Sequence, residues 1–256
     1  MPVASFGAKF FIRLFYINRE PTTPKQIIVN LIIAFCICQG CSTTRTQQSE
    51  ILPNKSVSYP RNRTDLNQLR ASFARFNNND TSSLYEIKLC ADVPYDKNPS
   101  KVVHKREPGH VFLIFSQCLS HNAAVSHAFG YYPVRPATVI FGKNVRSEVR
   151  NNRGRVYDAE IAVRVKADLF FALLDSSITL ASRKYNLNKF NCYDFGIGIF
   201  NSAAGIEVIP IQYVKFPFIW GRGGSPTGLY SQLKLLQEKV PYWAPHIQFG
   251  QFNAPH

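Results

Sequence analysis

The stretch from Lys189 to Gly205, KFNCYDFGIGIFNSAAG, constrains the fold most strongly because its pattern defines a complete buried helix. Its apolar residues recur at helical spacing and form one wide stripe: Phe195, Ile197, Ile199, Phe200, Ala203 and Ala204. Gly205 is a helix stop signal, and Cys192 lies in the first turn. A thiol there faces the positive end of the helix dipole, which favours its thiolate form. The sequence therefore predicts a core helix that begins with a cysteine placed for reactivity.

Length and charge limit what the rest of the chain can form. The 256 residues, of which 45% are hydrophobic, are enough for one sizeable core or two small ones. The formal net charge is +14, so anionic partners are expected: membrane headgroups, cell-wall polymers or nucleic acid. Net charge alone does not choose among these partners.

The N-terminal region has the pattern of a targeting signal. Ile27 to Ile37 is an apolar run of eleven residues after Lys25. A helix needs about 20 residues to span a bilayer core, so this run suits the apolar region of a signal peptide. The following CQGC at 38–41 resembles the bacterial lipobox, although Cys38 departs from the usual Leu or Val. The resemblance implies that 1–41 is a signal peptide with an N-terminal extension, that Cys41 is lipidated, and that the protein is lipid-anchored in the cell envelope. A lone membrane anchor and an ordinary cleaved signal are the alternatives.

The remaining chain divides into a polar tether and a folded domain. Residues 42–82 are rich in Ser, Thr, Asn, Gln and Arg and predict a flexible tether before a domain over 83–256. Strands are expected at 84–93, 110–116, 125–132, 137–141 and 158–165. Helices are expected at 168–182 and 227–239 in addition to the helix with Cys192. Strands followed by helices predict an α+β domain whose antiparallel sheet packs against helices, including the cysteine-bearing one.

A cysteine nucleophile needs a base within hydrogen-bond reach and a third group that orients this base. The chain has six histidines, and only His110 opens a strongly apolar strand directly after a glycine. The order is therefore a histidine on a strand, then further strands, then a cysteine at a helix start. This is the reverse of the papain order.

That order, with GHVFLIF at 109–115 and NCYDF at 191–195, resembles the circularly permuted papain-like cysteine hydrolases. They include permuted relatives of the NlpC-type cell-wall peptidases and the lecithin–retinol acyltransferase-like enzymes. The resemblance covers roughly Leu84 to Gly205. It implies a circularly permuted papain-like domain with Cys192 as the nucleophile and His110 as the base.

Other site residues follow from the same resemblance. His127 is the nearest candidate for the third catalytic residue, and Tyr131 or Ser126 are the alternatives. Asn191 and Tyr131 are expected to contact the substrate. No cofactor is implied.

The resemblance implies a thiol hydrolase that cleaves amide bonds, with peptidoglycan stem peptides as the expected substrate. The Cys192 thiolate would attack the carbonyl carbon, and His110 would protonate the leaving amine. A lipid acyltransferase or deacylase of the same fold is one alternative. A lipoprotein that uses this fold only for binding is another. The expected partners are peptidoglycan or another anionic envelope polymer, and the membrane through the N-terminal lipid, but not nucleic acid.

Several of these residues also have ordinary explanations. A cysteine such as Cys192 is more often inert in a core than catalytic. Cys90 and Cys118 lie on neighbouring predicted strands and either form a disulfide worth about 3 kcal/mol or stay reduced. The basic loop from Lys143 to Arg155 is either a solvated hairpin or a contact for an anionic polymer. No spacing of His and Cys is typical of zinc, so no metal site is expected.

Overall fold

The computed structural model describes residues 63–64, 66–77, 83–94, 109–119, 124–216 and 221–256, which all belong to one compact unit, Gln48–His256. Its main feature is a seven-stranded sheet in the order β1-β5-β4-β3-β2-β6-β9, in which neighbouring strands run antiparallel. These strands are β1 (Arg63–Thr64), β2 (Leu84–Asp92), β3 (His110–Cys118), β4 (Ala124–Pro133), β5 (Ser147–Asn151), β6 (Val156–Val165) and β9 (Ile247–Asn253). A separate hairpin pairs β7 (Val214–Lys215) with β8 (Arg222–Gly223).

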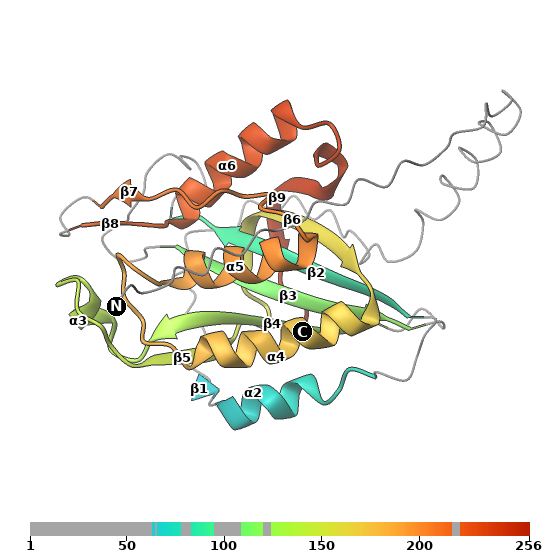
Figure 1. Cartoon of the computed structure of the whole chain (residues 1–256), viewed down its shortest axis with the longest axis horizontal. Coiled ribbons are helices and arrows are strands. Elements are labelled where there is room, and N and C mark those ends of the chain that lie inside the picture. Colours follow the sequence, from blue (N-terminus) through green and yellow to red (C-terminus); the bar gives the residue numbers. More distant parts are fainter. Residues whose placement is uncertain (1–62, 65, 78–82, 95–108, 120–123, 217–220) are drawn as a thin grey trace, which may run out of the picture. The chain divides into compact units, whose positions relative to one another are not determined.

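The main helices pack against one face of this sheet. They are α2 (Leu66–Phe73), α4 (Ala167–Ala181), α5 (Cys192–Ala204) and α6 (Pro226–Lys239). Buried residues of all four belong to a single apolar core together with alternate residues of the central strands. Shorter helical turns are α3 (Pro136–Val139) and η1 (Ala244–His246). Figure 1 shows α5 lying across the strands between α4 and α6.

Helix α5 lies at the centre of the main core, as its apolar pattern predicts. It buries Phe195, Ile199 and Ala203 and ends at Gly205, whose φ of 72° is the left-handed conformation that favours glycine. Gly196 allows close contact with the sheet, because a Cβ there would lie 2.7 Å from Leu89 Cδ1. The first turns of the helix therefore pack closely on side chains of the central strands.

The opposite face of the sheet carries a smaller apolar cluster. Its buried members come from β2, β3, β4, β6 and the C-terminal segment: Cys90, Phe112, Ile114, Ala128, Tyr157 and Ala254. Phe252 packs against them. The sheet is therefore buried on both faces at its centre, with the main helices on one side.

The predicted α+β class with an antiparallel sheet packed against helices is confirmed. The strand expected at 137–141 is wrong: Pro136 begins the short helical turn α3, because proline suits the first position of a helix. Strands β5 and β9 were not predicted. Among the described residues, no helix is both long and apolar enough to cross a membrane. Cys41 and the predicted signal lie outside the described residues.

Candidate functional site

Cys192 is the first residue of α5, and a capping box fixes this helix start. The Asn191 side-chain oxygen accepts a hydrogen bond from the Tyr193 backbone N–H at 2.8 Å. In return the Asp194 carboxylate accepts one from the Asn191 backbone N–H at 2.9 Å. Both bonds satisfy donors that a helix start otherwise leaves unpaired. The sequence Asn-Cys-Tyr-Asp therefore places the thiol in one defined position.

Cys192 is 8% exposed, and burial raises the pKa of its thiol above the ordinary value. Hydrogen bonds from the Val111 backbone N–H, the Tyr185 hydroxyl and the Tyr193 backbone N–H act in the opposite direction, while the Asp194 charge adds to the rise. Burial outweighs the three donors, so the predicted stabilisation of the thiolate is wrong. The thiol is therefore protonated at neutral pH.

His110 lies on the opposite face of the sheet from Cys192. On β3, Val111, Leu113 and Phe115 belong to the core around α5, whereas Phe112 and Ile114 belong to the second cluster. Side chains alternate between the two faces of a strand, so His110 shares the face of Phe112. Its ring stacks on Phe112 and on Tyr132, with centroids 6.2 and 4.0 Å away. The His110 ring therefore lies on the second face, whereas its neighbour Val111 lies beside the Cys192 thiol.

The His110 ring occupies space that a side chain on β4 would otherwise fill. A Cβ on Gly130 would lie 2.2 Å from His110 Nε2 and 2.8 Å from Asn152 Nδ2. Burial and the charges of Arg155 and Arg150 lower the pKa of His110 well below its ordinary value. His110 is therefore a neutral, buried ring in a polar layer on the second face.

His127 shares the face of Cys192 but lies far along the sheet. It is opposite Phe115, four residues from the Val111 that contacts the thiol, which is about 13 Å along a strand. Its Nε2 lies 3.0 Å from the Ser72 hydroxyl, and its ring packs edge-on against Phe73. Burial and the Arg75 charge lower its pKa to about 4. These contacts place His127 in the packing between β4 and α2.

Tyr131 packs against residues at the start of α5. Its ring stacks on Phe195 and Tyr185, with centroids 5.1 and 5.4 Å away. Its hydroxyl donates to the Arg183 carbonyl at 2.6 Å. Ser126, in contrast, lies on the second face, where its hydroxyl is 2.9 Å from that of Ser116. Tyr131 therefore supports Tyr185, which contacts the thiol and which the sequence did not reveal.

Both the oxygen and the nitrogen of the Asn191 side-chain amide form hydrogen bonds within the fold. Besides capping α5, its Nδ2 donates to the carbonyls of Leu187 at 2.9 Å and Gly224 at 3.0 Å. It is buried. Asn191 therefore ties two neighbouring loops to the helix start.

The predicted Cys90–Cys118 disulfide is wrong. Cys90 is a free buried thiol. Cys118 lies opposite Leu84, and Cys90 lies opposite Phe112, so the two are six residues apart along the strand pair. This corresponds to about 20 Å, whereas a disulfide requires Cα atoms within about 7 Å.

Three loops meet where α5 begins. The first connects α3 to β5, the second connects α4 to α5, and the third forms β7 and β8. Asn186 Nδ2 donates to the Gly142 carbonyl at 3.0 Å, which joins the first two. Asn188 packs against Gly221, which joins the second and third. In Figure 1, α3, the β7–β8 hairpin and the start of α5 all lie at the left-hand end of the sheet.

These loops are uniformly basic. Segments 134–146, 182–191 and 213–224 hold three, three and two Lys or Arg, respectively, and no Asp or Glu. We call these eight exposed residues the basic end: Arg135, Lys143, Arg146, Arg183, Lys184, Lys189, Lys215 and Arg222. The nearby Glu148 is paired with Arg150, at 2.6 Å between Oε1 and Nε. The basic end is therefore a cationic surface with no acidic residue of its own.

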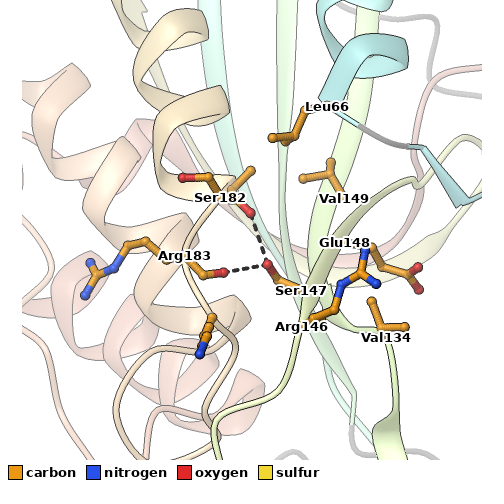
Figure 2. Close-up of a pocket in the computed structure, with 10 residues that line it drawn as sticks. Leu66, Val134, Arg146, Ser147, Glu148, Val149, Ser182 and Arg183 are labelled. Carbon is orange, nitrogen blue, oxygen red and sulfur yellow. Dashed lines mark hydrogen bonds between the residues drawn. The ribbon is translucent and has the colours of Figure 1, made fainter.

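A pocket of about 560 Å³ opens at the basic end. Arg146, Arg183 and Lys184 line it beside an apolar floor that includes Leu66 and Val149. Ser147 holds one wall in place, because its hydroxyl contacts the Ala181 and Arg183 carbonyls at 3.1 and 2.5 Å. Figure 2 shows Ser147 bridging to the end of α4, with the Arg183 side chain directed away from it. The pocket thus combines cationic and apolar contacts with one carboxylate, that of Glu148.

Sequence reasoning found only part of this surface. The predicted basic loop from Lys143 to Arg155 contributes Lys143 and Arg146, but β5 and its turn form the rest of that loop. Lys and Arg are clustered in three separate segments of the sequence, and these clusters indicate cationic surface. Only the fold shows that the three segments lie side by side. In the described part of the chain, no group of three His, Cys, Asp or Glu is arranged to hold a metal ion.

Comparison with known proteins found no match to this chain among protein-family models, curated proteins or solved structures.

Proposed function

We propose that this protein is a lipid-anchored envelope lipoprotein whose α+β domain binds an anionic surface through its basic end. The observation that carries the proposal is that eight exposed cationic residues, and no acidic residue of the same segments, lie at one end of the domain. Like charges gathered on one surface produce a potential that attracts anionic groups and speeds their association. The +14 formal charge of the chain favours the same class of partner.

The pocket at the basic end supports this proposal. Arg146 and Lys184 present cationic groups above an apolar floor. Arg183 stacks its guanidinium over the Phe190 ring at 3.8 Å, which fixes its position. Phosphate or carboxylate groups of an envelope polymer suit such a pocket, because Arg and Lys hydrogen bonds to anions are strong.

Binding is favoured over catalysis by the positions of Cys192 and His110. The antiparallel sheet packed against a cysteine-bearing helix is compatible with the proposed circularly permuted papain-like scaffold. Thiol hydrolysis, however, needs an imidazole within reach of the sulfur, and the His110 ring stacks on Phe112 and Tyr132 on the second face of the sheet. A raised thiol pKa also lowers the fraction of nucleophilic thiolate.

Thiol hydrolysis remains the second candidate, with Cys192 as the nucleophile. The observation that favours it is that the Val111 backbone N–H and the Tyr185 hydroxyl both act on the thiol so as to favour its thiolate form. Its substrates would be peptidoglycan amide bonds or, by acyl transfer or deacylation, lipid esters. Labelling with a thiol-reactive probe tests it. Product formation that disappears in Cys192→Ala would establish this second candidate, and equal labelling and unchanged products would exclude it.

The binding proposal is tested by charge removal. The full chain is mixed with cell-wall fragments and with phosphatidylglycerol vesicles, and the bound fraction is measured as salt is raised. We expect Lys143→Gln, Arg146→Gln, Lys184→Gln and Lys189→Gln, combined in one protein, to abolish most binding to at least one of these surfaces.

The matched control removes four exposed cations elsewhere: Arg75, Arg164, Lys166 and Lys239. It lowers the net charge equally, so general electrostatics predicts an equal loss. Similar binding by both variants would contradict a specific basic end.

A further inference from the structure

An apolar tip projects from the middle of the basic end. Ile140 and Phe141 follow α3 and are 42% and 68% exposed. Arg135, Lys143 and Arg146 flank them along the chain. An anionic polymer does not require exposed apolar side chains, whereas an anionic bilayer offers both charged headgroups and an apolar interior.

The tip is held in place rather than loosely attached. Val139 is buried in the main core directly before it. Gly142, with φ of 67°, turns the chain after it and donates its N–H to the Val139 carbonyl at 3.0 Å. The Gly142 carbonyl accepts from Asn186. The fold therefore presents two large apolar side chains to the outside at a fixed position.

We infer that the basic end docks onto an anionic phospholipid membrane, with Ile140 and Phe141 inserted among the lipids and the surrounding cations on the headgroups. This inference rests on the proposed function and names its partner. The cations and the apolar tip act together, because stable membrane attachment generally requires two signals. A lipid at Cys41 would then be joined by a second contact made by the domain.

The first part of the expected 42–82 tether is compatible with this docking, whereas β1 and α2 in its second part belong to the folded domain. Residues 42–62 lie between the proposed lipid and β1, and 21 residues extend over at most about 70 Å. The domain then stays within that distance of the membrane that holds the lipid. Turning the start of α5 toward the lipid also directs the pocket and the Cys192 end of the helix to the membrane.

Site-specific fluorescence tests the docking. Phe141→Trp places a reporter at the tip, and its added emission over wild type is measured with vesicles whose acyl chains are brominated. Ile206→Trp is the matched control, because Ile206 is 63% exposed and lies next to Glu207, just beyond the end of α5 and about 20 Å from the start of that helix. Both positions are exposed, so neither change should disturb folding.

We expect the tip reporter to be quenched in phosphatidylglycerol vesicles and not in phosphatidylcholine vesicles, and the Ile206 reporter to remain unquenched. Combining Lys143→Gln, Arg146→Gln and Lys189→Gln should weaken vesicle association roughly 100-fold. An unquenched tip on a chain that still binds anionic vesicles or wall fragments in a salt-dependent way would overturn the docking and leave the proposed function intact. Absence of binding to every anionic surface would overturn both.

Discussion

Acidification should destabilise this domain through His127, and the structure allows the size of the effect to be worked out. Burial holds the pKa of His127 at about 4, whereas an unfolded histidine titrates near 6.5. Between these values the unfolded chain binds a proton that the folded chain does not bind. Stability therefore rises with pH across this window and is lost as pH falls toward 4.

The difference in pKa corresponds to about 3 kcal/mol in the free energy of unfolding at pH 4 and about 2 kcal/mol at pH 5. His127→Phe removes this dependence and keeps a ring against Phe73 and Phe129. It also removes the bond to Ser72, worth about 1 kcal/mol. The variant should thus be slightly less stable than wild type at pH 7 and more stable below pH 5.

Urea denaturation of both proteins between pH 4.5 and 7.5, followed by tryptophan fluorescence, measures the pH at which the two unfolding free energies become equal. His110 and the carboxylates titrate in both proteins, so the difference between the two curves isolates His127. Parallel curves over the whole range would refute the reasoning that links burial of this ring to stability.

Four further predictions concern α5 and the packing around His110. Gly130→Ala should destabilise the domain by about 1–3 kcal/mol, because its Cβ would meet His110 Nε2 at 2.2 Å. Gly198→Ala, with nothing within 4 Å of its Cβ, should stabilise it by up to about 1 kcal/mol in the same urea assay. Asn191→Ala should cost about 2 kcal/mol or more through the lost cap and two unpaired carbonyls, and an unchanged midpoint would contradict this role. Cys192 should react slowly with a chromogenic disulfide at pH 7 and faster as pH rises past 9, whereas rapid modification at neutral pH would contradict the raised pKa.

Local patterns predicted α5 correctly because its signals lie within the helix itself. The apolar spacing, the Asn191 cap and Gly205 are all local. The face of His110 could not be predicted in the same way. A strand buried on both sides has apolar residues at every position, as β3 does from Val111 to Phe115, so the pattern does not show which side chains share a face. Only the packing against α5 resolves this.

The basic end shows a second limit of sequence reasoning. Its cations come from three segments that Asn186 and Asn188 hold together through contacts far apart along the chain. Charge runs are visible in each segment, but their meeting depends on the strand order. Edge strand β9 was missed for a related reason, since its Gln-rich and Gly-containing sequence has little strand propensity and pairs with β6 through its backbone.

Lysine footprinting on the bound protein tests the central proposal most directly. The full chain is acetylated with and without an anionic surface, either wall fragments or phosphatidylglycerol vesicles, and the modified lysines are quantified by mass spectrometry. We predict that Lys143, Lys184 and Lys189 become protected on binding, while Lys166 and Lys239 react as in the free protein. Equal protection of all five, or protection of Lys166 and Lys239 alone, would contradict binding through the basic end.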